Sequence, residues 1–495
     1  MAAAAAGGTR MICWPMAQQQ VHVSGGGGGS GSGVASCSGG QGVVRRYADR
    51  LQVSRVLPVA VAAPSQFLVT RSSGMRGNLV LCSGKFEVRA VRGSGTRAVS
   101  QVVEATTAGL RETVEDTAVA DGHSRSFEGI QTEQELMLAI SKEVDSGRLP
   151  KRGGAGMEEL YRNYRDAVLS SGVEDPMDVA VKVMATVLDR ILLQFEDPFT
   201  FSSYHPRMTD PYDYYTFGQN YVRPLIDYRN SYLGNLEIFD KIEKNLKEGH
   251  NVILLSNHQT EADPAVMALL LEQTHPYLAE NLTYVAGDRV VLDPFCKPFS
   301  MGRNLLCVYS KKHINDVPDL AEMKKKANAK TLMQMSSLLR KGGRLLWVAP
   351  SGGRDRPDPE TNEWVPAPFD SSAVESMKRL SEVVRVPAHI HPMSLLCFEI
   401  MPPPVQVQKE LGERRAVGFS GVGLAVSEEL DFESIAKREA NPQNLKDAIS
   451  ATAWNEVNDM YNALKAAIYG EQGCGSSTSS LRLEQPWLEE SRLRV

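Results

Sequence analysis

The sequence lacks a long hydrophobic run. Its most apolar segment, Val179 to Phe195, is interrupted by Lys182, Asp189 and Arg190. A transmembrane helix needs about 18 or more predominantly apolar residues in succession. We therefore expect no membrane-spanning segment in this chain.

Cysteines are few, and they lie far apart. No two form a Cys-x-x-Cys pair and no spacing recurs, whereas zinc sites and disulfide frameworks depend on such spacings. We expect no metal and no cofactor, and a reducing compartment fits best. The seven cysteines are Cys13, Cys37, Cys82, Cys296, Cys307, Cys397 and Cys474.

Acidic residues are scarce at the N-terminus. Residues 1–100 contain eleven Lys and Arg but only Asp49 and Glu87 as acids, and they are rich in Gly and Ser. Such a composition is typical of an organelle transit peptide. The segment Glu87 to Val91 resembles a stromal processing site, so we predict a chloroplast transit peptide over residues 1–90 and a flexible leader over 91–125. An N-terminal arm without a targeting function is the alternative.

The remainder of the chain has an acidic balance. It carries 43 basic and 57 acidic residues, although the 42% hydrophobic content of the whole chain is ordinary for a globular protein. Nucleic-acid-binding domains present a strongly basic face. This balance argues against a nucleic-acid partner.

Two patterns of hydrophobic periodicity divide the folded part. Residues 126–203 have helical periodicity, with Thr132 and Glu135 at capping-box spacing and Asp175 and Pro176 at the start of a further helix, and they predict a small helical bundle. Residues 204–470 alternate short apolar runs with helical stretches, and they predict an α/β domain with a mixed sheet flanked by helices. Residues 471–495 form a tail without periodicity. The predicted strands lie at 251–256, 282–287, 304–310, 344–350, 387–396 and 415–426, and the clearest helices at 319–341 and 442–469.

Two histidines are followed by an aspartate five positions later. His205 and Asp210 lie among Tyr- and Pro-rich segments with no buried strand before them, which favours a loop histidine. His258 follows the apolar run 251–256, and Asp263 precedes Pro264 at the predicted start of a helix. Strand ends in α/β sheets hold catalytic side chains beside a crevice. His258 is therefore the stronger candidate, while Asp263 also fits an ordinary helix N-cap.

The stretch "SNHQTEADP" resembles the first signature block, H-x-x-x-x-D, of the glycerolipid acyltransferases. Together with "YDYYTFGQNYVRPLIDYRNS", "VAGDRVVLDPFCKPFSMGRNL", "CVYSKKHIND" and "WVAPSGGRDRPDP", it makes residues 125 to 470 resemble the soluble plastid glycerol-3-phosphate acyltransferases of plants. The third block of the wider superfamily reads P-E-G-T-R, but here it reads P-S-G-G-R, Pro350 to Arg354. A lysophosphatidate-type acyltransferase is accordingly the weaker reading.

Acyl transfer from a thioester to an alcohol requires removal of the hydroxyl proton. Histidine suits that step near neutral pH, so the resemblance and the strand context make His258 the candidate base. Asp263 would hold the other ring nitrogen, as the acid of a Ser-His-Asp triad does. Glu261, between the two, fits a solvated loop residue.

Glycerol 3-phosphate is a small dianion, and its phosphate requires charge-assisted donors. Lys312, His313, Arg354 and Arg356 follow two predicted strands, and the resemblance implies that these positions line the phosphate pocket. The alternative for "GGRDR" is an exposed turn whose arginines pair with Asp355 and Asp358.

The resemblance implies an acyl-[acyl carrier protein] or acyl-CoA donor, a location in the chloroplast stroma and a monomer. The run "KKKANAK", with Lys324, Lys325, Lys326 and Lys330, could receive an acidic carrier, although a solvated helix face is the commoner explanation.

Two other functions stay open. One is a hydrolase that uses His258, which the lack of H-E-x-x-H and G-x-S-x-G motifs argues against. The other is a non-catalytic plastid protein that binds lipid or carrier.

Overall fold

The computed structural model describes residues 127–311, 314–404, 414–439, 441–470 and 480–482. All of these belong to one compact unit. The predicted transit peptide (1–90), the leader (91–125) and most of the tail (471–495) lie outside the described residues, as do Lys312 and His313.

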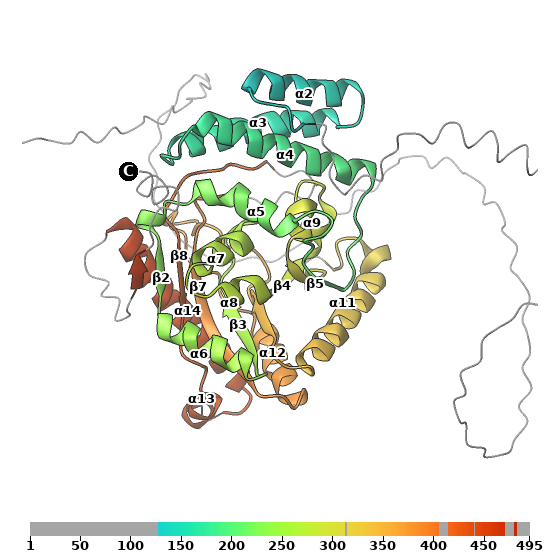
Figure 1. The fold of residues 1–495 in the computed structure, drawn as a ribbon. Coiled ribbons are helices and arrows are strands. Elements are labelled where there is room, and N and C mark those ends of the chain that lie inside the picture. The colour runs from blue at the N-terminus through green and yellow to red at the C-terminus, as the bar shows by residue number, and fades with distance from the viewer. Residues whose placement is uncertain (1–126, 312–313, 405–413, 440, 471–479, 483–495) are drawn as a thin grey trace, which may run out of the picture. The chain divides into compact units, whose positions relative to one another are not determined.

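Three helices form the N-terminal part of the described chain: α2 (Glu133–Asp145), α3 (Lys151–Leu169) and α4 (Pro176–Glu196). They lie side by side at one end of the described fold (Figure 1). Thr132 and Glu135 make the predicted capping box, in which each side chain accepts a hydrogen bond from the other residue's backbone N–H. Asp175 is the N-cap of α4 and Pro176 is its first residue, as predicted, but the Asp175 side chain makes no capping bond.

The remaining described chain builds one nine-stranded sheet in the order β1-β5-β4-β6-β3-β7-β8-β2-β9. The central strands β5, β4, β6, β3 and β7 are parallel, whereas β7 and β8 pair antiparallel. The mixed α/β architecture after a helical region is therefore confirmed. The strands are β1 (Tyr204–His205), β2 (Tyr232–Gly234), β3 (Asn251–Ser256), β4 (Leu282–Gly287), β5 (Asn304–Val308), β6 (Leu345–Val348), β7 (Ala388–Leu396), β8 (Gly423–Val426) and β9 (Ser480–Arg482).

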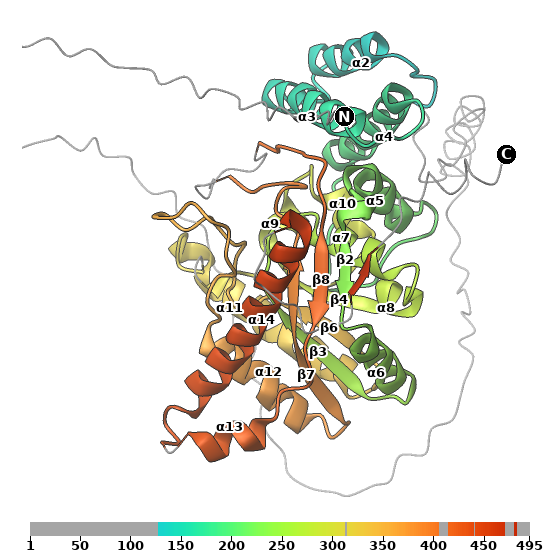
Figure 2. The ribbon, with the colours of Figure 1, turned by 90° about the vertical axis from the view of Figure 1, so that its left-hand side faces the viewer.

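Helices cover both faces of this sheet. In β3, Val252 and Leu254 pack into a core shared with α6 and α7, whereas Ile253 and Leu255 pack against α11, α12 and α14 on the other face. Burial on both faces explains why the strand reads as one continuous apolar run. Figure 2 shows α14 running along the sheet beside β7 and β8. These helices are α5 (Tyr214–Val222), α6 (Leu236–Lys247), α7 (Asp263–Leu271), α8 (Pro276–Asn281), α9 (Asp288–Leu292), α10 (Lys297–Met301), α11 (Pro318–Leu339), α12 (Ser371–Val383), α13 (Phe432–Arg438) and α14 (Leu445–Tyr469), with 3-10 turns at Arg223–Leu225 and Tyr228–Asn230.

His205 does not lie in a loop, so that prediction is wrong. It belongs to the short edge strand β1, which pairs antiparallel with β5, and it is only 4% exposed. Its Nε2 lies 3.1 Å from the carbonyl oxygen of Met301, and its ring packs edge-on against Phe199 and Phe201. Burial lowers the pKa of His205, which fits a neutral core histidine.

The helical region contacts helices of the α/β region through specific side chains. The Tyr164 hydroxyl of α3 donates to the backbone oxygen of Tyr221 in α5 at 2.9 Å, and the two rings stack. The Gln194 amide of α4 donates to the sulfur of Met301 in α10 at 3.5 Å. The division into domains at residues 203 and 204 therefore stays a proposal.

Candidate active site

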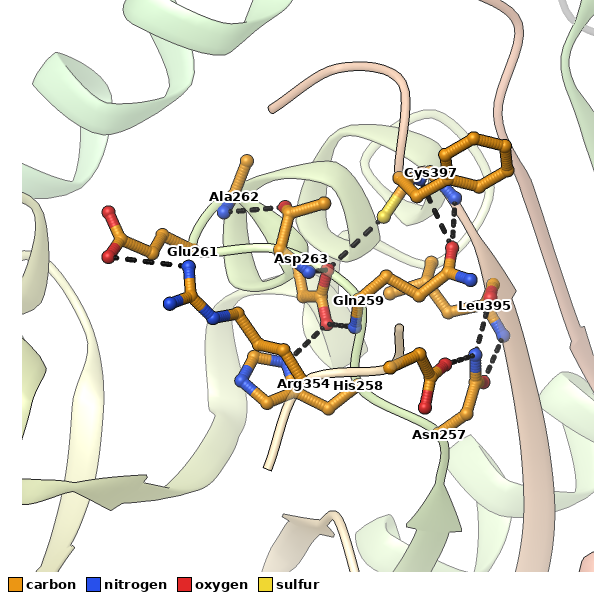
Figure 3. A network of polar contacts seen from close by, with 12 residues as sticks. Asn257, His258, Gln259, Glu261, Ala262, Asp263, Arg354, Leu395 and Cys397 are labelled. Atoms are coloured by element: carbon orange, nitrogen blue, oxygen red, sulfur yellow. Dashed lines mark hydrogen bonds and ion pairs between the residues drawn. The ribbon is translucent and has the colours of Figure 1, made fainter. Parts of the chain in front are cut away.

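His258 and Asp263 meet just beyond the C-terminal end of β3. The Nδ1 of His258 lies 2.7 Å from Oδ2 of Asp263, as Figure 3 shows. The Asp263 side chain is fully buried, whereas the His258 side chain is 27% exposed. Because a carboxylate can only accept, Nδ1 carries the proton, and in the neutral imidazole Nε2 presents a lone pair. No hydrogen-bond partner of Nε2 is found in the part of the chain that the structure describes.

Three further donors hold the Asp263 carboxylate. The backbone N–H of Gln259 donates to Oδ2 and that of Thr260 to Oδ1, each at 2.8 Å, and the Cys397 thiol donates to Oδ1 at 3.2 Å. Burial raises the pKa of the Cys397 thiol well above its usual value, which keeps it protonated. Asp263 is the first residue of α7 rather than its N-cap, which is Ala262. The Asp263 carboxylate thus accepts backbone N–H groups of the preceding loop and also fixes the orientation of the His258 imidazole.

Asn257 and Gln259 tie the histidine loop to the end of β7. The Asn257 side chain donates to the Leu395 carbonyl at 2.8 Å and accepts from the Leu395 N–H at 2.9 Å. The side-chain amide oxygen of Gln259, Oε1, accepts from the Cys397 and Phe398 N–H groups at 2.7 and 3.1 Å. Both side chains are fully buried. The backbone that carries His258 is therefore held on both sides, as an oriented base requires.

The "GGRDR" segment follows β6, which is the neighbour of β3, and it contacts the histidine loop directly. The Asp355 N–H donates to the His258 carbonyl oxygen at 2.6 Å. The Asp355 carboxylate accepts from the Asn257 amide at 3.0 Å and from the Ala367 N–H at 2.9 Å. These bonds place Arg354 and Arg356 on either side of a residue that is bonded to the backbone of His258. The structure thus brings four of the six predicted site residues together.

Arg354 pairs with Glu261 rather than with an aspartate of its own turn. Its Nη1 lies 3.6 Å from one Glu261 oxygen, while Arg415 Nε donates to the other at 2.8 Å. Burial alone would raise the pKa of Glu261, but the Arg415 and Arg354 guanidiniums lower it to about 2. The prediction of a solvated Glu261 is therefore wrong. It is a carboxylate between two arginines and is ionised near neutral pH. Figure 3 shows Arg354, the arginine of this pair that belongs to the predicted phosphate pocket.

Lys312 and His313, the other two predicted phosphate ligands, lie outside the described residues. The described residues contain no group of three or more His, Cys, Asp and Glu side chains that could hold a metal ion. Within the same ranges, no helix is long and apolar enough to cross a membrane.

Two family models match the chain. One describes the glycerol-3-phosphate acyltransferase N-terminal region and matches residues 124–199; the other describes acyltransferases and matches residues 237–396. The chain is 52% identical over 404 residues to a chloroplastic glycerol-3-phosphate acyltransferase of Cucurbita moschata, covering 80% of this chain and 87% of that protein. The chain belongs to the glycerol-3-phosphate acyltransferase family. Family members named chloroplastic in Arabidopsis thaliana and Spinacia oleracea are 50% and 51% identical to it, over 81% and 74% of this chain and 88% and 77% of their own lengths.

Sequence reasoning missed several residues that shape this acyltransferase site. Cys397 and Arg415 reach it from more than a hundred positions away, so no local spacing marks them. Asn257 stands directly before His258, and an amide at the end of a fully buried strand could have signalled a tie to the neighbouring strand. The sequence suggests a role for Asp355 only as a partner of the arginines in an exposed turn, but Asp355 is fully buried.

Replacing Asp355 with Asn should change how the stability of this acyltransferase depends on pH. Burial raises the pKa of Asp355 to about 7, although the bonds from Ala367 and Asn257 and the nearby His258 lower it. The folded protein therefore binds more protons than the unfolded chain between about pH 4 and 7, so this group's contribution to stability falls as pH rises through that window. As the pH is raised from 5 to 8, the melting temperature of the wild type should therefore fall relative to that of Asp355→Asn.

Asp358→Asn is the matched control in the same segment. Backbone hydrogen bonds from Thr361 and Glu360 lower the pKa of Asp358, so its effect on stability changes only at more acidic pH. Thermal melts of the three proteins at intervals from pH 5 to 8 make the comparison. A constant difference between wild type and Asp355→Asn across this range would show that Asp355 does not titrate there.

Proposed function

We propose that the protein transfers an acyl chain from acyl-[acyl carrier protein] or acyl-CoA to the sn-1 hydroxyl of glycerol 3-phosphate. The product is 1-acyl-sn-glycerol 3-phosphate, and the reaction is the first step of plastid glycerolipid synthesis. One observation carries this proposal. An oriented histidine, with Nε2 turned away from its aspartate, lies one backbone hydrogen bond from the Arg354–Arg356 segment.

The geometry supports general-base catalysis by His258. Nε2 takes the proton of the substrate hydroxyl as its oxygen attacks the thioester carbonyl carbon, and a tetrahedral oxyanion forms. The C–S bond then breaks, and the thiolate leaves with the proton that the imidazolium returns. Asp263 stabilises the imidazolium between these steps without being protonated itself. No acyl-enzyme intermediate is needed, because the substrate supplies the nucleophile.

We assign the phosphate of glycerol 3-phosphate to Arg354 and Arg356, together with Lys312 and His313 from outside the described residues. An arginine fork matches two phosphate oxygens at once. The Arg354 side chain is 13% exposed, so a bound dianion would meet it in a partly desolvated place. The Glu261 carboxylate lies 3.6 Å from Arg354 and so offsets part of the positive charge of the proposed phosphate site.

The relatives' names support a plastid location, and we propose the stroma as the compartment, with a monomer as the active form. Residues 1–90 fused to a fluorescent reporter should direct it into isolated chloroplasts, where the reporter should become resistant to added protease. A fusion to residues 127–216, which begins inside the described fold, is the control. Reporter that stays outside would leave the N-terminal arm without a targeting function.

Acyl transfer itself can be tested with the full chain. Radiolabelled acyl donor and glycerol 3-phosphate should give labelled 1-acylglycerol 3-phosphate, and omission of glycerol 3-phosphate should leave the donor intact. A hydrolase would release free fatty acid in both mixtures. A lysophosphatidate-type enzyme would need lysophosphatidate as acceptor, and a non-catalytic binding protein would yield no product with any acceptor.

A further inference from the structure

Helix α11 carries a basic and apolar outer surface. From Met323 to Leu339 it contains four lysines and no acid. Of the twelve large apolar side chains that are exposed among the described residues, five lie on α11 or directly before it, and Met333 at 67% is the most exposed of all twelve. The α11 face is defined by Met323, Lys325, Lys326, Lys330, Leu332 and Met333, which are all exposed.

Several lysines on other helices are neutralised by a carboxylate of the same segment, which is uncommon on the α11 face. Lys244, Lys378 and Lys437 pair with glutamates four positions away on α6, α12 and α13. Such pairs are typical of a solvated helix face. Of Lys325, Lys326 and Lys330, only Lys325 has such a pair within the described part of the chain, with Glu322 three positions away at 2.9 Å. The α11 face is thus a positive patch on a chain whose folded part is acidic.

The α11 face lies at the same edge of the sheet as His258. Leu254, Trp347, Tyr284 and Leu305 are successive register partners across β3, β6, β4 and β5. His258 lies four residues beyond the first of these, and Tyr309 lies four residues beyond the last.

Asn328 anchors the middle of α11 at this level. Its side chain accepts from the Tyr309 N–H at 2.7 Å and donates to the Tyr309 carbonyl at 2.9 Å. Three strand spacings, about 14 Å, separate β5 from β3. The lysines on either side of Asn328 are therefore close to the catalytic edge but too far away to touch the reacting atoms.

We propose that the α11 face is the docking surface for the protein part of an acidic acyl carrier. This inference rests on the proposed function, because it concerns the donor of that reaction. Carboxylates of the carrier would meet the lysines, and its apolar side chains would meet Met323, Leu332 and Met333, whose flexible or branched side chains adapt to a partner. A carrier bound there holds its acyl thioester on a long flexible arm, which can span the separation from His258.

Charge complementarity favours such a carrier over a lipid surface. The remainder of the chain has a net negative charge that disfavours an acidic protein, whereas the positive α11 face attracts it, so the two effects together favour one orientation of the carrier. A bilayer would contact a plane made of several elements. The other exposed large apolar side chains, however, lie singly on separate elements, such as Leu138 on α2 and Leu169 on α3.

The test compares two donors that carry the same acyl chain. Lys325→Glu, Lys326→Glu and Lys330→Glu are combined in the full chain, and kcat/KM is measured with acyl carrier protein thioester and with acyl-CoA, which has no protein part. The carrier reaction should fall about 10- to 100-fold at low salt. The acyl-CoA reaction should stay within about twofold, and the difference should shrink as added salt screens the charges. Met333→Asp should likewise weaken only the carrier reaction.

Lys241→Glu, Lys244→Glu and Lys437→Glu together make the same charge change elsewhere and should affect neither donor. These lysines are exposed, and they lie on α6 and α13. Equal losses with both donors, or no loss with either, would overturn the docking surface. Unchanged carrier kinetics with loss of binding to vesicles of anionic phospholipid would assign the α11 face to a lipid surface instead. If the wild type used neither donor, the proposed function itself would fail.

Discussion

Replacing His258 by alanine is expected to lower kcat by about 10²- to 10⁴-fold, the usual contribution of a positioned general base. The structure gives a specific reason for an effect of this size. Nδ1 is committed to the buried Asp263 carboxylate, which leaves Nε2 as the atom that can accept the substrate proton. The measurement is the initial rate of acyl transfer at saturating glycerol 3-phosphate, with folding checked by circular dichroism.

His389→Ala is the matched control for that substitution. His389 is also a partly exposed histidine whose Nδ1 contacts a carboxylate, here Glu429 at 2.8 Å. It lies near the N-terminal end of β7, however, whereas His258 lies beyond the C-terminal end of the neighbouring strand β3. Its loss should leave kcat within about twofold. His205→Ala should lower the melting temperature instead, because His205 is a buried core residue. If His258→Ala and His389→Ala kept equal activity in folded protein, His258 would not be the base.

The local part of this site was predictable from the sequence. The run 251–256 predicts a buried strand that the structure places with the same bounds, and His258 and Asp263 lie five positions apart just beyond it. A strand, its end and the following helix are contiguous in sequence, so hydrophobic periodicity and helix-start residues locate them. The mixed sheet was also predictable, because the last predicted strands lie too close together in sequence for every one of them to be parallel.

The long-range part was not predictable in the same way. Cys397 contacts Asp263 across 134 positions, and Arg415 contacts Glu261 across 154. Such contacts depend on the order of strands in the sheet, which a single sequence does not specify. The segment 415–426 was predicted as one strand, but only Gly423–Val426 joins the sheet. Arg415 lies in its irregular first part, from which its side chain reaches Glu261.

Another long-range contact, through Asp355, connects the proposed base His258 to the proposed phosphate clamp. The Asp355 N–H bonds the His258 carbonyl, and its carboxylate bonds the Asn257 amide beside the base. A substrate whose phosphate is held by Arg354 or Arg356 would thus meet a base whose position relative to the clamp is fixed by the backbone. Holding two reacting groups in one geometry lowers the entropic part of the barrier.

Replacing Arg354 or Arg356 by alanine is expected to raise KM for glycerol 3-phosphate. The phosphate is remote from the thioester and keeps its charge throughout, so contacts to it are made in both the ground state and the transition state. A charge-assisted contact is worth about 1.5 to 3 kcal/mol, which corresponds to a loss of roughly 10- to 150-fold in kcat/KM. If the clamp also positions the hydroxyl, part of that loss will appear in kcat. Acyl transfer is measured against glycerol 3-phosphate concentration for each variant.

Two further variants separate a phosphate clamp from a merely charged turn. Arg354→Lys should recover only part of the loss, because an ammonium cannot present the planar fork that matches two phosphate oxygens. Arg438→Ala removes an exposed arginine from α13 and should leave the saturation curve unchanged. Glu261 adds a second constraint, since Arg354 must share its charge between this carboxylate and the phosphate. Unchanged saturation in well-folded Arg354→Ala and Arg356→Ala proteins would mean that the phosphate binds elsewhere.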